Sequence, residues 1–348
     1  MKPHRPGRGD AADVTQVSPL LSTAQEPGVA AEPLPGVVRS EAMVWVPGDE
    51  AHGVAGFWID RFPVTNAAFA RFVEATGHVT VAERERISLV FHPPRRLTLG
   101  RRGPRGWAPT PGADWQHPRG PRTSLRALGG HPVVHLAWSD VVAYAGWAGL
   151  AVPTEAEWAC AARGLDGTDH PSGHEPEPGA LRRTNSWQGE FPGDQRGPDG
   201  HSHTSPLQAF PANGLGVYDA IGNVWEWTAD APPAGPADSA DPAPCHPRAE
   251  ELVELATLVE PPDGDGAPLP RFDTDVNIGF RVVKGGSFLC GPGHCTHLRP
   301  TARVVMPTGI SAGHIGFRCV ARAPRAPRAA QAPRADRLDG VAPVTLEG

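Results

Sequence analysis

Cysteine, methionine and tyrosine are scarce in this sequence, whose 348 residues include five, three and two of them, respectively. Five cysteines are too few, and odd in number, for the disulfide framework that holds small secreted domains together. Long apolar runs are also lacking, because glycine, proline or charge interrupts each of them, which argues against a membrane-spanning helix. The basic N-terminus has no apolar segment after it, so it does not predict a secretory signal. We therefore expect a cytoplasmic protein with reduced thiols.

An excess of positive charge is lacking as well. The formal net charge is −6, and acidic and basic residues are mixed along the chain. Nucleic-acid binding needs a basic patch or stripe, and binding to anionic lipid needs a polybasic cluster. We therefore expect neither a nucleic acid nor a membrane among the partners.

Glycine and proline, by contrast, are abundant, with 41 residues each. Many lie in residues 1–38 and 323–348, whose polar composition, rich in proline and alanine, predicts disorder. We expect one globular domain over 39–322, interrupted by a Pro/Asp/Ala-rich insertion at 229–270. The domain is rich in turn residues, and the chain contains ten tryptophans. This composition predicts an irregular, loop-rich α+β fold with little regular secondary structure.

The clearest local signals are those of three short helices. They are predicted over 65–77, 139–149 and 154–164, each beginning at a threonine or serine that can cap it and ending at a glycine. The third begins with a capping box, Thr154 with Glu157 three residues later.

Strands are predicted where short apolar segments lie between turn residues, at 43–48, 56–65 and 280–290. Residues 84–130 mix proline, glycine and arginine, and we expect them to be irregular.

Two of the five cysteines lie on one loop. Cys290 and Cys295 are separated by four residues, three of which are glycine or proline, and such a loop turns sharply and stays in place. Thiolates are soft ligands that select Cu(I) over hard cations. A structural zinc site would need four ligands, and no C-x-x-C pair supplies the rest. A metal site, a disulfide and two small buried side chains all remain open from this spacing alone.

The order of several segments resembles a known family. These segments are FWIDRFPVTNAAFARFVEATGHVTVAE, HPVVHLAWSDVVAYAGWAGLAVPTEAEWACAARG, NSWQGEF, FPANGLGVYDAIGNVWEW, KGGSFLC and GHIGFRCV. In this order they resemble formylglycine-generating enzymes, also called sulfatase-modifying factors, from about residue 42 to 321. The most specific feature is the C-x4-C pair after G-G-S.

The resemblance implies an irregular fold related to C-type lectins and a copper-dependent oxidase. Such an enzyme converts a cysteine in a C-x-P-x-R type motif of an unfolded or nascent sulfatase to Cα-formylglycine. It uses O₂ and a thiol reductant, and Cys290 and Cys295 would hold the Cu(I). We expect it to act as a monomer.

The resemblance also assigns roles to residues around the pair. Ser287 would lie beside the metal, with its hydroxyl bonded to a sulfur or to bound oxygen; the alternative is a turn serine that caps a backbone amide. Trp225 would lie near the substrate cleft, although Trp225 and Trp227 alternate as in a strand and one of them belongs to the core. Arg299 and Arg303 would bind the substrate backbone or form a structural salt bridge.

Two sets of oxygen ligands would bind Ca²⁺ and hold loops in place, since Ca²⁺ prefers carboxylate, amide and carbonyl oxygens. The alternative for Asp219 is that it only makes a turn. By the resemblance, the first set is Asn185, Ser186, Asp199 and His201, and the second is Asp219, Gly222, Val224 and Glu226.

Some features depart from the family pattern. An Arg/Tyr-rich run is replaced by residues 296–298 (THL), and an acidic residue by Gly309, so the peptide groove is expected to be altered. Cys319 is expected to be a buried thiol that Cys160 could reach, and Cys245 in the insertion has no assigned role. Residues 170–177 (HPSGHEPE) are expected to form a solvated loop.

Two other functions compete with the oxidase. One is a non-catalytic binding or regulatory module on the same scaffold, but paralogues of that kind lack the cysteine pair. The other is a sister oxidase of sulfur metabolism that uses non-haem iron. It would require an additional His-rich helical domain, which residues 1–38 cannot supply.

Overall fold

The computed structural model describes residues 42–93, 106–165, 183–193, 200–232, 245–247, 251–252, 279–291, 294–295 and 297–322. The two ends predicted to be disordered, most of the insertion and the loop at 170–177 lie outside the described residues. None of the helices described is both long enough and apolar enough to cross a bilayer.

The described chain is an irregular α+β fold, as predicted. Its helices are α1 (Asn66–Thr76), α2 (Val81–Glu85), α3 (Trp138–Trp147) and α4 (Glu155–Arg163), with a 3₁₀ turn η1 (Glu50–His52). Its strands are β1 (Met43–Val46), β2 (Phe57–Asp60), β3 (Ile87–Phe91), β4 (Trp107–Pro111), β5 (Trp225–Trp227), β6 (Phe280–Lys284), β7 (Arg303–Pro307), β8 (Ile315–Gly316) and β9 (Val320–Arg322).

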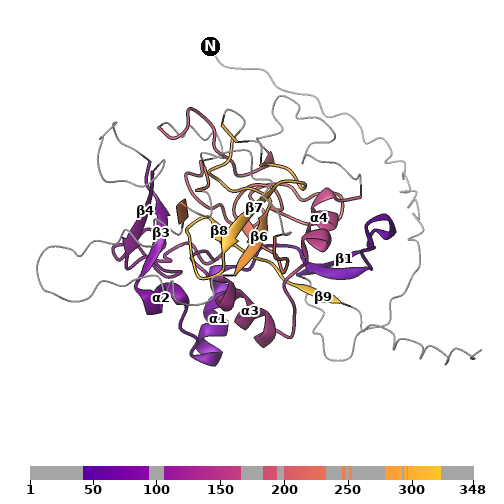
Figure 1. Ribbon diagram of the computed structural model, residues 1–348, viewed down its shortest axis with the longest axis horizontal. Helices are drawn as coiled ribbons and strands as arrows, with labels where there is room; N and C mark the ends of the chain where they lie inside the picture. Colours follow the sequence, from indigo (N-terminus) through magenta and orange to yellow (C-terminus); the bar gives the residue numbers. More distant parts are fainter. Residues whose placement is uncertain are drawn as a thin grey trace, which may run out of the picture. The chain divides into compact units, whose positions relative to one another are not determined.

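A three-stranded sheet joins the first and last strands of the domain. Its order is β1-β2-β9, with both pairs antiparallel. Cys319, just before β9, donates its backbone N–H to the Asp60 carboxylate at 2.8 Å. This sheet therefore pairs the beginning of the domain with its end, about 260 residues later in the sequence (Figure 1).

A four-stranded sheet carries the segment with the cysteine pair. Its order is β7-β6-β5-β8, with β8 parallel to β5 and the other pairs antiparallel. At the end of β6, Gly285 has φ +95, and a Cβ there would lie 2.4 Å from the Ala220 carbonyl oxygen. Only glycine fits this close approach. The chain therefore turns directly from β6 into the Cys290 loop.

Local capping determines where the helices begin. Thr65 caps α1 by accepting the Ala68 N–H at 3.1 Å, and the capping box of Thr154 and Glu157 opens α4 as predicted. Helix α3 begins earlier than predicted, with Ala137 rather than Ser139 at the cap position. Asp140 replaces a side-chain cap by accepting the Ala137 N–H at 3.0 Å.

The prediction that residues 84–130 are irregular is wrong in part. Strands β3 and β4 pair antiparallel over five residues each, and Ile87 and Trp107 bury their side chains in the core. A further capping box, Thr80 with Glu83, opens the short α2 just before them. Burial of all five β3 residues and of Trp107 outweighs the weak strand propensity of the prolines in β4.

The core is dominated by tryptophan. Trp225 and Trp227 are both fully buried, although only one of them was assigned to the core from the sequence. The larger core cluster also contains Cys245, Cys290 and Cys295, so the cysteine loop is packed into the domain.

Candidate metal centre

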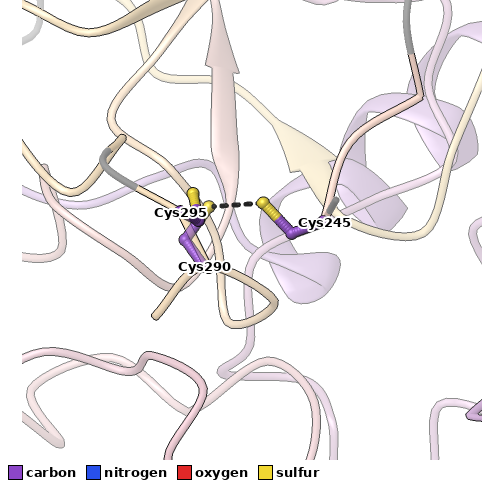
Figure 2. Close-up of side chains that lie close together, drawn as sticks. All are labelled: Cys245, Cys290 and Cys295. Carbon is purple, nitrogen blue, oxygen red and sulfur yellow. Dashed lines mark hydrogen bonds between the residues drawn. The ribbon is translucent and has the colours of Figure 1, made fainter. Parts of the chain in front are cut away.

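Three cysteine side chains converge inside the domain. The Sγ atoms of Cys245, Cys290 and Cys295 all lie within 4.8 Å of one another, and those of Cys245 and Cys290 are 3.4 Å apart. Figure 2 shows Cys290 and Cys295 side by side on one loop, with Cys245 facing them from another segment. All three side chains are buried, and all three are free thiols.

Hydrogen bonds hold the loop of the predicted pair tightly. Cys295 donates its N–H to the Gly291 carbonyl at 2.9 Å, and Trp187 donates its N–H to the Cys290 carbonyl at 2.7 Å. A Cβ at Gly291 would lie 2.4 Å from the Trp187 carbonyl oxygen, so a larger residue would push the loop away. The sharp, fixed turn expected from glycine and proline is therefore present in the described part of the loop.

Ser287 contacts the cluster through its backbone. Its N–H points at the Cys290 Sγ at 3.4 Å, whereas its hydroxyl accepts the Leu289 N–H at 3.3 Å. The hydroxyl thus makes the turn contact that was the alternative interpretation, and the amide supports the sulfur.

Imidazole and indole rings surround the thiols. The His297 Nδ1 lies 3.3 Å from the Cys295 Sγ, and the Trp225 ring lies 5.5 Å from that of His297 and 5.9 Å from that of His246. His246 Nδ1 and His314 Nε2 are 2.8 Å apart. Trp225 therefore lies beside the cluster, whereas Trp227 packs against Trp138.

Burial and mutual hydrogen bonds shift the pKa values of the three thiols in different directions. Burial raises the pKa of the Cys245 and Cys290 thiols. Hydrogen bonds from Cys245, and to a lesser extent from Cys290, hold the pKa of the Cys295 thiol well below its ordinary value. His297 adds to this effect. These hydrogen bonds favour the thiolate form of Cys295, the form in which cysteine binds metals.

Several buried polar atoms near the thiols have no hydrogen-bond partner among the described residues. They include the Trp225 Nε1, the His246 Nε2 and the His314 Nδ1. Burial lowers the pKa of His246 to about 3 and also lowers that of His314, so both rings are neutral. An unpaired buried polar group costs about 1–3 kcal/mol. The surroundings of the cluster thus retain polar groups that a bound molecule could satisfy.

A soft metal ion fits this donor set. Three buried sulfurs at mutual distances within 4.8 Å match the ligand preference of Cu(I) and not that of hard cations. Within the part of the chain that the structure describes, this is the one cluster of three or more His, Cys, Asp or Glu ligand atoms.

The first predicted calcium set is only partly described, because Asp199 lies outside the described residues. The Asn185 side chain donates to the His203 carbonyl at 2.8 Å and to the Asn223 Oδ1 at 3.1 Å. Its buried Oδ1 has no hydrogen-bond partner among the described residues. That oxygen is an acceptor that a cation could use.

The two carboxylates of the second predicted calcium set differ in their hydrogen bonds. Both Glu226 oxygens are bound, by Arg318 at 2.7 Å each and by the Trp158 Nε1 at 2.7 Å. The buried Asp219 Oδ2 has no partner among the described residues, and burial raises the pKa of this carboxyl to about 7. The Asp219 Oδ2 could therefore bind a cation at this position, whereas the Glu226 oxygens could do so only while also bonded to Arg318.

Of the two arginines considered for substrate binding, Arg303 has a structural partner. Its Nε lies 3.1 Å from the Glu155 Oε1, and the buried Lys284 Nζ lies 3.0 Å from the same oxygen. Arg299 is exposed. The salt-bridge alternative therefore describes Arg303.

Cys245, His246, His297 and His314 were missed from the sequence. The insertion around Cys245 has no periodicity that would place it against the Cys290 loop, 45 residues further on. His314 is likewise brought to His246 by tertiary packing. His297, in contrast, contacts Cys295 from only two residues away, and this spacing is a signal that could have found it. The expectation that Cys319 is a buried thiol is confirmed, and Cys160 is a partly buried free thiol.

Comparison with known proteins identifies the family. The model of the "Sulfatase-modifying factor enzyme 1-like domain" matches residues 34–323. "Formylglycine-generating enzyme" of Thermomonospora curvata is 43% identical over 271 residues, 76% of this chain and 82% of that protein. The protein of the same name from Mycobacterium tuberculosis is 40% identical over 284 residues, 77% and 88% of the two chains.

A relative described as inactive also matches. "Inactive C-alpha-formylglycine-generating enzyme 2" of Bos taurus is 36% identical over 249 residues, 67% of this chain and 78% of that protein. The resemblance read from the motifs is thus confirmed, and the chain belongs to the sulfatase-modifying factor enzyme 1-like family.

Proposed function

We propose that this protein is a formylglycine-generating oxidase that converts a cysteine of an unfolded sulfatase to Cα-formylglycine. The observation that carries the proposal is the pair of buried thiols at Cys290 and Cys295 in a chain of this family. Similarity alone does not separate active from inactive relatives, because both kinds match. The cysteine pair favours an active enzyme, because it supplies a soft-metal site that a binding module would not need.

The overall reaction balances with O₂ and a thiol reductant. The target cysteine, R–CH₂–SH, loses two electrons and becomes the aldehyde R–CHO, and its sulfur leaves as H₂S. Two reductant thiols lose two more electrons and form a disulfide. O₂ takes up the four electrons. Its two oxygen atoms are balanced by one molecule of water and the oxygen of the aldehyde.

Cys290 and Cys295 would hold a Cu(I) ion, which would supply O₂ activation and a place for the target sulfur. The Ser287 N–H hydrogen-bonds the Cys290 sulfur and so fixes its direction. His297 does the same for Cys295 through its Nδ1. Trp225, fully buried beside His297, would shield that side of the cluster from water.

The target is expected to be an extended peptide. Cys290 is fully buried and Cys295 is only 7% exposed, so the target cysteine must reach into the domain to meet them. The side chain of a folded protein cannot extend that far, whereas an unfolded or nascent segment with a C-x-P-x-R type motif can. Binding such a segment orders it, which costs conformational entropy and leaves affinity to a few anchor residues.

Calcium, the compartment and the quaternary state complete the proposal. The unpartnered Asn185 and Asp219 oxygens support Ca²⁺ binding between loops that lack regular structure. Five free cysteines agree with a reducing compartment, and we place the protein in the cytoplasm as a monomer.

The non-haem iron alternative has less support. An iron site would need a cluster of histidine and carboxylate ligands, and the cluster found among the described residues consists of cysteines.

Substitution of the thiols tests the proposal. Cys290→Ser and Cys295→Ser should each abolish formation of formylglycine in a C-x-P-x-R peptide, because a hydroxyl is a poor ligand for Cu(I). Cys160→Ser is the matched control, since Cys160 is a free thiol outside the cluster. Activity within about tenfold of the parent in either loop variant, equivalent to less than about 1.4 kcal/mol, would rule out the assignment.

A further inference from the structure

The third thiol of the cluster comes from the insertion. It lies at the position that the proposed reaction requires to be free for the target cysteine. Two thiolates on one loop leave a place for a third sulfur, which the proposed function gives to the target cysteine. The Cys245 Sγ is already there, 3.4 Å from the Cys290 Sγ and within 4.8 Å of the Cys295 Sγ (Figure 2).

The segment around Cys245 is anchored in the core. Cys245 is 0% exposed and His246 is 5% exposed. His246 is hydrogen-bonded to His314, which lies just before β8, and Leu252 is buried in the same core cluster as Cys245. The position of the Cys245 sulfur therefore results from its own burial and from the packing of residues that follow it in the chain.

The sequence of this segment resembles the start of the proposed target motif. Residues 245–247 read Cys-His-Pro, which matches the C-x-P of C-x-P-x-R. An arginine follows at position 248, one place earlier than in the motif and outside the described residues. The thiol and the C-x-P order therefore match the start of a target peptide.

We propose that Cys245 is an internal third thiolate ligand of the metal centre and that Cys245–Pro247 occupies the target's place until a target peptide displaces it. This inference rests on the proposed function and adds a self-blocking segment to that site. The Cys245 thiolate and the target cysteine then compete for one position on the same two-cysteine centre.

Two simpler roles for Cys245 are distinguishable from this one. Free cysteine is often a small buried side chain with no further role. A disulfide with Cys290 is the other, but the sulfurs are 3.4 Å apart, well beyond the bond length of about 2.05 Å. Neither role predicts that removing the thiol affects the metal and the peptide in opposite directions.

The proposal predicts those opposite effects. Without Cys245 the metal loses one of three sulfurs and is held less tightly. The peptide, in contrast, no longer competes with an internal ligand, and its apparent affinity is no longer reduced by the small fraction of open sites. Cu(I) affinity should therefore fall while KM for the peptide also falls.

The experiment compares the parent with Cys245→Ala, Cys245→Ser and the control Cys160→Ser, all reduced and anaerobic until turnover is measured. X-ray absorption of the Cu(I)-loaded parent without peptide should show three sulfur neighbours, and the Cys245 variants should show two. Competition with a chromophoric Cu(I) chelator should show about tenfold or greater weakening, and KM for a C-x-P-x-R peptide should drop by a similar factor. Cys160→Ser should match the parent in each measurement.

A test on the parent alone does not depend on the variants folding. Anaerobic addition of the peptide should expose Cys245 to alkylation by iodoacetamide, which peptide mapping would locate. Two sulfur neighbours in the peptide-free parent would overturn the inference, as would unchanged labelling of Cys245. If the parent oxidises the peptide in either case, the proposed function survives, whereas failure to bind Cu(I) and to oxidise the peptide would overturn both.

Discussion

Arg318 and Glu226 form a buried, bidentate ion pair. The Arg318 Nε and Nη2 each lie 2.7 Å from a Glu226 oxygen, and the side chains are 1% and 0% exposed. Arg318 also donates to the Tyr218 and Asp60 carbonyls at 2.8 and 3.1 Å. The pair thus joins β5, which adjoins the metal centre, to the sheet formed by β1, β2 and β9.

Removing one member of this pair should strongly destabilise the domain. Arg318→Met leaves the Glu226 carboxylate buried without its counter-charge, and we expect a loss of about 3–5 kcal/mol in the free energy of unfolding. Arg303→Met is the control: Arg303 is 44% exposed in its pair with Glu155, and such pairs contribute about 0–1 kcal/mol. Urea denaturation measures both, and equal losses in the two variants would contradict the role given to Arg318.

Calcium should stabilise the parent through Asp219. A ligand that binds only the folded state adds stability by mass action, about 2.7 kcal/mol at a concentration of 100 Kd. We expect chelation to lower the Tm of the parent and to leave that of Asp219→Ala nearly unchanged. Asp49→Ala, at an exposed turn, should respond to chelation as the parent does. A parent whose Tm is insensitive to chelator would refute the second calcium site.

Asp60 should make stability fall as the pH rises toward neutrality. Burial raises the pKa of its carboxyl from 3.8 to about 7, so between these values the folded state binds a proton that the unfolded state has lost. The Asp60 contribution to the free energy of unfolding is therefore fully present below about pH 4 and is lost as the pH rises through about 7.

Asp60→Asn should remove that contribution to the pH dependence while its amide oxygen can still accept the Cys319 N–H. Buried histidines contribute the opposite slope, since burial lowers the pKa of His135 to about 4. The informative quantity is therefore the stability of the variant minus that of the parent, measured with chelator present. This difference should rise between pH 5 and 7, and a flat or falling difference would contradict the buried, proton-binding carboxyl.

Discrimination at the arginine of the target motif should be weak. Residues 296–298 and Gly309 replace groups that the family resemblance places near the cleft, and Gly309 is exposed with nothing within 4 Å of the position of a Cβ. Replacing the arginine of a C-x-P-x-R peptide by alanine should lower kcat/KM by less than about a hundredfold, or about 2.7 kcal/mol. A larger loss would show that the groove binds the arginine through other residues. Faster turnover of a folded, unmodified sulfatase than of the peptide would contradict the requirement for an extended target.

Local signals were enough to predict some elements. The capping box at Thr154 and the Thr65 cap involve residues three positions apart, so their hydrogen bonds are readable from the sequence. The start of α3 was placed wrongly, because Asp140 reaches back to the Ala137 N–H where no side-chain cap exists. Strands β3 and β4 were missed, because their pairing joins segments separated by a stretch rich in arginine, glycine and proline.

Spacing along the chain predicted the cysteine pair of the candidate site, although His297, two residues after Cys295, was missed. Cys290 and Cys295 share one short loop, so a convergence of their thiols could be expected from their spacing. Cys245 reaches them only through packing of the insertion, and His314 reaches His246 from a loop 68 residues away. No periodicity or spacing encodes such contacts, and they became visible only in the folded structure.

The proposed function requires the cysteine pair to act as a copper-dependent centre that forms formylglycine. The most direct measurement is an anaerobic Cu(I) titration of the reduced protein, followed at each point by mass spectrometry of a C-x-P-x-R peptide after exposure to O₂ and a thiol reductant. We expect the cysteine to be converted to formylglycine with loss of its sulfur, and conversion to saturate at one Cu(I) per chain. Cys290→Ser and Cys295→Ser should show no conversion. An unmodified peptide at saturating Cu(I), or equal conversion without copper, would contradict the proposed function.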